Sequence, residues 1–175
     1  KSNAKDKIKE ETITFSQKIF LHDLSYCYPS KAIPSINSIN CYIKKNETTA
    51  ILGTTGSGKT TLLSLIVGLI NPSKGQLKID KQSLNYKNIN DWQSKISFVP
   101  QETIIIDGSI SDNIALILNK KIDKNKLIHA LKLTKLEKFV SHIDDAEIIG
   151  ERGVKISGGE KQRIGLARAV YDDKS

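Results

Sequence analysis

Residues 53–60 read Gly-Thr-Thr-Gly-Ser-Gly-Lys-Thr, and this glycine-rich loop constrains the fold more than any other stretch of the chain. Residues 49–52 before it are apolar and predict a short buried strand, and the apolar run that follows from Thr60 predicts a helix. Because glycine has no Cβ, backbone N–H groups in such a loop can turn inward around an anion. The helix N-terminus adds unpaired donors and a partial positive charge. The sequence therefore predicts a site for a nucleoside triphosphate.

All residues of this loop are candidate nucleotide contacts. Lys59 is expected to reach the β- and γ-phosphates, and the Thr60 hydroxyl is expected to ligate Mg²⁺. The other residues of the loop complete the expected cradle: Gly53, Thr54, Thr55, Gly56, Ser57 and Gly58. A turn rich in glycine and serine that only leads into a helix is the structural alternative. The order of strand, loop and helix favours the nucleotide site.

Length and composition predict a soluble globular domain. With 175 residues, of which 38% are apolar and 26% are charged, the chain can bury one sizeable core. Its longest apolar run, residues 62–70, is far shorter than the roughly 20 residues that a membrane span requires. No signal peptide is visible. Cys27 and Cys41 lack metal-ligand spacing, so we expect two free thiols in a reducing compartment.

The net charge of +8 is compatible with a nucleic-acid partner or an anionic membrane surface. The lysines are scattered, however, and the most basic stretch, residues 119–126, contains Asp123 and no aromatic side chain. Such a stretch is typical of a solvated surface loop. We therefore expect no nucleic-acid partner.

Alternation of apolar and polar residues predicts half-buried strands in the N-terminal part of the chain. We expect strands at residues 12–15, 18–26, 35–43, 76–80 and 95–99. Asn46 is expected to adopt a positive φ in the turn between the third strand and the glycine-rich loop. Beyond residue 99 the sequence is expected to be mostly helical as far as Ile143.

A second motif, Ile-Ser-Gly-Gly-Glu-Lys-Gln-Arg, occupies residues 156–163. It opens a predicted amphipathic helix whose apolar side is formed by Ile164, Ala167, Val170 and Tyr171. A Ser-Gly-Gly run at a helix N-terminus can bind an anion through backbone donors, or it can simply cap the helix. From the motif alone, both interpretations stay open.

The two motifs together resemble the nucleotide-binding domain of ATP-binding cassette (ABC) transporters. The second motif of that family is typically Leu-Ser-Gly-Gly-Gln, so Ile156 and Glu160 depart from the pattern. Glu160 places an acid near the expected anion and is expected to weaken the contact. The resemblance adds Thr61 near the α-phosphate, and it makes these residues of the second motif nucleotide contacts: Ser157, Gly158, Gly159 and Glu160.

Two smaller motifs extend the resemblance. Phe-Val-Pro-Gln-Glu at residues 98–102 looks like the Q-loop, which implies that Gln101 contacts Mg²⁺ and the region of the attacking water. Residues 24–29 look like the A-loop, which implies that Tyr28 stacks on adenine. Taken alone, the Pro-Gln pair predicts only a loop. The alternative role of Tyr28 is that of a half-buried aromatic residue in a strand. Tyr26 is the less favoured stacking residue.

Two further segments favour the exporter type. Residues 107–114 resemble the segment that follows the Q-loop in exporters, and Gly-Glu-Arg-Gly at 150–153 resembles the exporter X-loop. On their own these segments are a turn and a charged loop. Their specificity comes from their order within the whole set of motifs.

The resemblance implies an α/β fold, the P-loop NTPase (ABC ATPase) fold, in three parts. These are an N-terminal antiparallel β-subdomain, a RecA-like core that lacks its C-terminal strands, and an α-helical signature subdomain. The expected division is a linker or cloning remnant at 1–11, β-subdomain and P-loop core at 12–101, helical subdomain at 102–168, and the start of a truncated return to the core at 169–175.

In this family the signature helix leads into a strand that ends Asp-Glu (Walker B) and later into a switch histidine. Asp172 and Asp173 follow the helix directly and do not match that strand. His22, His129 and His142 all precede the second motif. We therefore expect residues 1–175 to be a piece of a longer protein, less stable than the intact domain and deficient in ATP hydrolysis, with Lys59 and Gln101 as the catalytic residues that it does contain.

For the parent protein the resemblance implies an ATPase that powers export. Two such domains would dimerise head to tail around ATP and Mg²⁺, and the Q-loop and X-loop would contact a transmembrane domain at the cytoplasmic face of the cell membrane. Residues 150–171 resemble the corresponding segment of exporters of lipid-linked or polysaccharide intermediates. The alternatives are a soluble ABC-type ATPase that acts on DNA and a non-catalytic protein that keeps the loop as a structural anion site.

Overall fold

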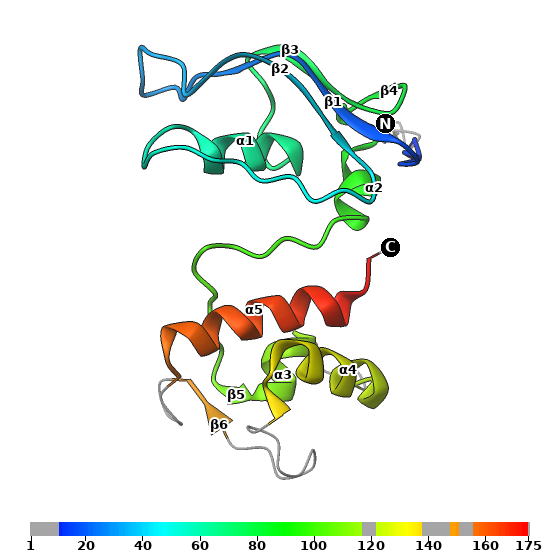
Figure 1. Cartoon of the computed structure of the whole chain (residues 1–175), viewed down its shortest axis with the longest axis vertical. Coiled ribbons are helices and arrows are strands. Elements are labelled where there is room, and N and C mark those ends of the chain that lie inside the picture. The colour runs from blue at the N-terminus through cyan, green and yellow to red at the C-terminus, as the bar shows by residue number, and fades with distance from the viewer. Residues whose placement is uncertain (1–10, 117–121, 138–147, 151–155, 175) are drawn as a thin grey trace, which may run out of the picture. The chain divides into compact units, whose positions relative to one another are not determined.

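The computed structural model describes residues 11–116, 122–137, 148–150 and 156–174 (Figure 1). The chain forms two compact units, Lys1–Ile96 and Ser97–Ser175. Each unit has its own buried apolar cluster, so each is described by itself.

The first unit is built on a four-stranded antiparallel sheet. Its strands are β1 (Lys18–Tyr26), β2 (Ile36–Lys44), β3 (Lys74–Ile79) and β4 (Gln82–Ser83), in the order β2-β1-β3-β4 (Figure 1). In the register Ile19 pairs with Ile43 on one side and with Ile79 on the other. Asn46 has a φ of 61°. The expected strands at 18–26, 35–43 and 76–80, and the expected turn, are confirmed within one or two residues.

Three other expected strands are wrong. Residues 12–15 are held by side chains instead of a ladder: Ile13 N–H donates to Asp91 Oδ2 (2.7 Å) and Thr14 N–H donates to Gln82 Oε1 (3.0 Å). Residues 95–99 begin at the end of a helix, where the Lys95 N–H donates to the carbonyl of Trp92, and no described segment pairs with the residues that follow.

The third wrong prediction concerns the apolar residues 49–52. This segment joins no sheet in the described part of the chain, and Leu52 is 89% exposed. An apolar segment becomes a strand only where a neighbour accepts and donates its backbone hydrogen bonds. No described segment does so here, so the strands among the described residues are all antiparallel.

Two helices complete the first unit. The predicted helix after the glycine-rich loop is α1 (Lys59–Ile66), and α2 (Ile89–Ser94) carries the buried Trp92. The Trp92 indole N–H donates to the carbonyl of Ile66 (2.9 Å), and its ring meets Phe15 edge to face at 5.8 Å. Both helices contribute side chains to the apolar cluster that also contains the inward-facing residues of β1 and β3.

The second unit is mainly helical. It contains β5 (Gly108–Ser109), α3 (Ile110–Ala115), α4 (Lys124–Thr134), β6 (Ile148–Ile149) and α5 (Gly158–Asp172). The expected helical character after residue 99 is confirmed in α3 and α4 but is wrong for residues 100–109, which are irregular apart from β5; residues 138–143 lie outside the described part. Ile164 and Ala167 of α5 are fully buried, and Val170 and Tyr171 pack against the same cluster, as the amphipathic pattern predicted.

Among the residues that the structure describes, every helix is too short or too polar to cross a lipid bilayer.

Candidate nucleotide-binding site

The glycine-rich loop folds around the side chain of its own lysine. The Lys59 ammonium donates to the carbonyl oxygens of Gly53 (2.8 Å) and Thr54 (2.6 Å). The Ser57 N–H donates to the Thr54 carbonyl (3.2 Å), and Gly56 has a φ of 81°. The loop is therefore a tight turn whose carbonyls face the ammonium group.

Helix α1 begins at this loop without a side-chain cap. Its N-cap is Gly58, no side chain accepts a hydrogen bond from its first turn, and that turn contains no acidic residue. In contrast, α3, α4 and α5 are capped by Ser109, Asp123 and Ser157. The first N–H groups of an α-helix lack intrahelical acceptors and carry partial positive charge. The N-terminus of α1 is thus suited to an anion such as a phosphate.

Gly58 has a second role, which the sequence did not reveal. Its φ is 91°, and a Cβ built there would lie 2.5 Å from the carbonyl oxygen of Ser35 and 2.9 Å from the Ile36 Cδ1. The end of the loop therefore touches the start of β2. Glycine is required at this position by packing as well as by the phosphate-binding geometry expected of the loop.

Tyr28 lies beside α1. Its hydroxyl is 3.2 Å from the Thr61 hydroxyl, and Thr61 is buried in the first turn of the helix. The Tyr28 ring meets Tyr26 edge to face at 4.9 Å, and the Lys31 ammonium is 5.8 Å from the ring centroid. A turn places Lys31 there, since its N–H donates to the Tyr28 carbonyl (2.9 Å). The first unit thus brings together the loop, Thr61 and Tyr28.

The Ser-Gly-Gly motif forms the N-terminus of α5. The Ser157 hydroxyl accepts a hydrogen bond from the Glu160 N–H (3.3 Å). In return, the Glu160 carboxylate accepts from the Ser157 N–H (2.9 Å) and from the Ser157 hydroxyl (2.8 Å). This is a complete capping box. Glu160, which departs from the family pattern, therefore accepts hydrogen bonds from two donors of the motif, the N–H and the hydroxyl of Ser157.

The remaining predicted site residues also belong to the second unit. Gln101 is exposed, in a stretch without regular secondary structure, and Gly158 and Gly159 are exposed in the first turn of α5. Residues 151–153 of the expected X-loop lie outside the described residues, and Gly150 has a φ of 117°. The predicted contacts thus fall into two sets, one in each unit.

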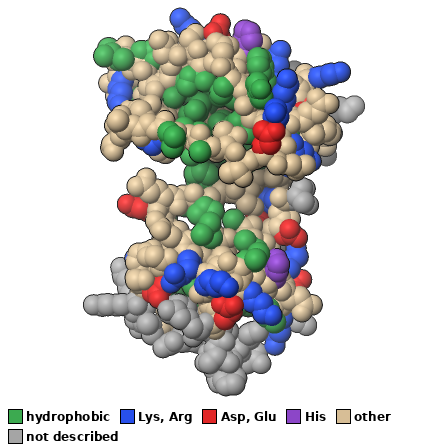
Figure 2. All heavy atoms as spheres, viewed as in Figure 1, with side chains coloured by type: hydrophobic (Ala, Val, Ile, Leu, Met, Phe, Trp, Pro, Cys, Tyr) green, Lys and Arg blue, Asp and Glu red, His purple; other side chains and the backbone are tan. Residues whose placement is uncertain are grey.

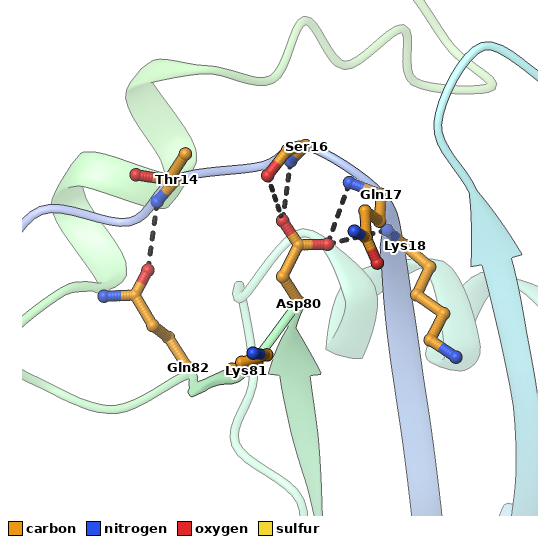
Figure 3. A pocket seen from close by; sticks show the side chains of 7 residues that line it. All are labelled: Thr14, Ser16, Gln17, Lys18, Asp80, Lys81 and Gln82. Carbon is orange, nitrogen blue, oxygen red and sulfur yellow. Dashed lines mark hydrogen bonds between the residues drawn. The ribbon is translucent and has the colours of Figure 1, made fainter.

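A polar hollow at the end of the sheet is a different feature, which sequence reasoning missed. It has a volume of about 340 Å³ and is lined by Thr14, Ser16, Gln17, Lys18, Asp80, Lys81 and Gln82 (Figure 3). The Asp80 carboxylate in it accepts hydrogen bonds from the backbone of Ser16 (2.6 Å), Gln17 (2.9 Å) and Lys18 (2.7 Å), as well as from the Ser16 hydroxyl (2.9 Å). These bonds tie the start of β1 to the end of β3, which gives Asp80 a structural role.

The described residues contain no cluster of three or more His, Cys, Asp or Glu side chains that could hold a metal ion. A Mg²⁺ ion held by a single hydroxyl and by the phosphates of a nucleotide needs no such cluster. The exposed Thr60, which follows Lys59 in the uncapped turn of α1, fits that arrangement.

Basic side chains do not gather into one patch on the face drawn in Figure 2, where Lys and Arg alternate with acidic and neutral residues over both units.

Comparison with known proteins identifies the family. The model of the "ABC transporter" family matches residues 36–175. ABC transporter B family member 29, chloroplastic, of Arabidopsis thaliana is 34% identical over 161 residues, which are 90% of this chain and 25% of that protein. The ATP-dependent lipid A-core flippase of Nitrosococcus oceani is 32% identical over 152 residues, which are 86% of this chain and 26% of the flippase. The chain thus spans about a quarter of the length of these relatives.

A solved structure agrees with the family match at the level of the fold. A bacterial Atm1-family ABC exporter with ATP bound matches with a TM-score of 0.82 at 23% identity, over 94% of this chain and 29% of the exporter. The likeness supports the α/β P-loop fold expected from the two motifs. The chain therefore belongs to the ABC transporter family, and it has the fold of the nucleotide-binding domains of exporters in that family.

Proposed function

We propose that this chain binds ATP with Mg²⁺ and is the ATP-binding part of an exporter. The observation that carries the proposal is the N-terminus of α1, which lacks a side-chain cap and follows a loop closed around Lys59. A triphosphate would accept hydrogen bonds from the free N–H groups of that turn and would draw the Lys59 ammonium from the loop carbonyls.

The other residues near the loop would complete the nucleotide contacts. The Tyr28 ring would stack on adenine, with its hydroxyl positioned by its contact with the Thr61 hydroxyl. Mg²⁺ would lie between the phosphates and the Thr60 hydroxyl, and it would neutralise charge on them. Gln101 would contact the Mg²⁺ ion and the region of the attacking water.

A second nucleotide-binding domain is the proposed partner across the nucleotide. Ser157 and Gly159 of one domain would cap the γ-phosphate held by Lys59 of the other. Because each site would then be shared between two domains, ATP would favour the closed pair through its higher affinity for that state. The Glu160 carboxylate must leave its two bonds to Ser157 before a phosphate can use the same donors.

The proposed membrane partner is a transmembrane domain, contacted through the Q-loop and the X-loop at the cytoplasmic face of the cell membrane. The proposed cargo is a lipid-linked or polysaccharide intermediate, because residues 150–171 resemble exporters of such compounds and a lipid A-core flippase is among the relatives. The relatives are transporters, so we do not propose the alternative function on DNA.

We further propose that residues 1–175 alone hydrolyse ATP very slowly. The sequence contains Lys59 and Gln101, but no residue in it matches the water-polarising Glu or the switch His of the family. Phosphoryl transfer depends on positioning the attacking water and on stabilising charge. The water-polarising Glu and the switch His of the family contribute to both.

Titration with Mg-ATP, followed by the melting temperature, tests the proposal. At about 100 times Kd, binding to the folded state should add roughly 2.7 kcal/mol to the free energy of unfolding. Lys59→Ala should abolish the shift, and Tyr28→Ala should reduce it, because base–aromatic stacking contributes about 1–3 kcal/mol.

The matched control is Lys132→Ala, which removes a lysine from the exposed side of α4. It should leave the shift unchanged. An equal shift in the wild-type chain and in Lys59→Ala would contradict the proposed site.

A further inference from the structure

Residues 97–107, which we call the Gln101 segment, have no regular secondary structure. The buried side-chain amide of Asn113 nevertheless holds the C-terminal end of this segment in place. Asn113 of α3 is 0% exposed. Its Oδ1 accepts from the Ile106 N–H (2.9 Å), and its Nδ2 donates to the carbonyls of Ile106 (2.9 Å) and Ser109 (3.0 Å). A single side chain therefore satisfies three backbone groups of the segment between Gln101 and α3.

Arg168 of α5 joins the same arrangement. Its Nε donates to the Asn113 carbonyl (2.6 Å), and its Nη2 donates to the Ile104 carbonyl (2.7 Å). These described partners are neutral oxygens, and desolvation by burial lowers the pKa of Arg168 below its ordinary value. The planar fork of the guanidinium thus joins α5 to both α3 and the Gln101 segment.

The backbone of α5 also approaches this segment closely. A Cβ built on Gly165 would lie 2.5 Å from the Thr103 Oγ1 and 3.2 Å from the Val99 Cγ1. Val99 and Thr103 stand two residues before and two residues after Gln101. The helix that begins with Ser157 therefore packs directly against both flanks of Gln101.

We propose that Arg168 and Asn113 are positioning residues that make the Gln101 segment and the signature helix α5 one rigid body. Gln101 and Ser157 are then held at a fixed spacing, although neither touches the other in any described contact. A displacement at the Ser157 end of α5 is transmitted to Gln101 through Arg168 and Gly165. The inference rests on the proposed function for the roles of Gln101 and Ser157.

The first test is hydrogen exchange of the whole chain without nucleotide, on wild type, Arg168→Ala and Arg168→Lys. The Ile106 amide should exchange about tenfold faster in Arg168→Ala, because its acceptor Asn113 loses the support of Arg168. Arg168→Lys keeps the charge but lacks the fork, so it should fall between the other two. The Leu21 amide of the first unit should not change, and Lys132→Ala should match the wild type throughout.

An unchanged Ile106 amide in both Arg168 variants would overturn the proposal. An equal increase over all of α4 and α5 would overturn it as well, because it would mean that Arg168 stabilises the unit without positioning the segment. If Arg168→Ala does not fold, Arg168→Lys supplies the same comparison.

The second test separates positioning from general stability by comparing Mg-ATP with Mg-ADP. Gln101 is proposed to act beside the γ-phosphate, so Arg168→Lys should lower the preference for ATP over ADP several-fold. The Kd for ADP should stay within twofold of the wild type. Equal weakening of both nucleotides, or an unchanged preference, would overturn the positioning role.

The two tests distinguish a failure of the proposed function from a failure of the positioning role. If the wild-type chain binds neither nucleotide, the proposed function is wrong. The exchange comparison then still decides whether Arg168 holds the Gln101 segment.

Discussion

Among the described residues, Asp80 has the carboxyl group whose ionisation is tied most strongly to the fold. Desolvation alone would raise its pKa, but hydrogen bonds from the backbone of Lys18, Ser16 and Gln17 and from the Ser16 hydroxyl outweigh it and lower the pKa from 3.8 to about 2. Between these values the unfolded chain binds more protons than the folded chain. The stabilisation by Asp80 is therefore present above about pH 4 and is lost as the pH falls towards 2.

We predict that Asp80→Asn is less stable than the wild type at pH 7, and that the difference shrinks as the pH falls from about 4 to about 2. Urea unfolding of both proteins at a series of pH values measures this difference in the free energy of unfolding. Ser16→Ala, which removes one of the four donors, should show a smaller version of the same dependence. A difference that is constant with pH would mean that Asp80 acts by packing alone.

Glu160 is the residue at which this chain departs most clearly from the family's second motif. Its carboxylate accepts two hydrogen bonds from Ser157, at the donors proposed for the γ-phosphate. Glu160→Gln keeps an acceptor for the capping box but removes the charge. Since two unit charges about 4 Å apart repel by about 1 kcal/mol in water, we predict that ATP-dependent association of the chain becomes about fivefold tighter.

Sedimentation equilibrium with and without Mg-ATP measures that association. Glu137→Gln makes the same charge change at an exposed position of the second unit and is the control. Equal effects of the two substitutions would trace the gain to net charge instead of to the motif.

At the scale of the elements, helix α1 depends on the glycine at its N-cap. Gly58 combines a φ of 91° with the close approach to Ser35, so Gly58→Ala introduces both backbone strain and a clash at the start of β2. Strain of this kind costs about 1–3 kcal/mol before the clash is counted. We predict a loss of at least that size in the free energy of unfolding, measured in urea without nucleotide.

Gly158 offers a matched comparison at the start of another helix. A Cβ there meets nothing within 4 Å, and alanine is the better helix former, so Gly158→Ala should leave stability unchanged or raise it by up to about 1 kcal/mol. If both alanine substitutions cost the same, the contact with Ser35 would not be the reason for Gly58.

At the scale of the whole molecule, the described residues form two apolar clusters, one in each compact unit. The first contains Leu21 and Ile79, and the second contains Leu127 and Ile164, all of them fully buried. Because each cluster is made of residues from one unit, we expect the two units to open as separate cooperative regions.

We predict that Leu127→Ala lowers the free energy of opening of the second unit by about 2–5 kcal/mol, the usual cost of such a cavity. The Leu21 amide of the first unit should keep its protection, which native-state hydrogen exchange measures residue by residue. A loss of the same size at Leu21 and in α4 would mean that the two units unfold as one.

The sequence by itself determined the features that depend on a few neighbouring residues. Local sequence patterns predict four of the observed features: the glycine-rich loop, the strands β1 and β2, the positive φ of Asn46 and the helix that begins after Ser157. A capping box joins residues three apart, and a strand on one face of a core needs only alternation. The sequence motifs, taken together and in their order along the chain, indicated the ABC family.

Only the tertiary structure decided the features that depend on a distant partner. Residues 49–52 and 95–99 carry the apolar pattern of strands, but a strand also needs a neighbour, and none pairs with them among the described residues. The contact of Gly58 with Ser35 and the bonds from Arg168 to Asn113 and Ile104 join residues far apart in the chain. Local sequence does not encode such pairs, because they form only when the whole core is assembled.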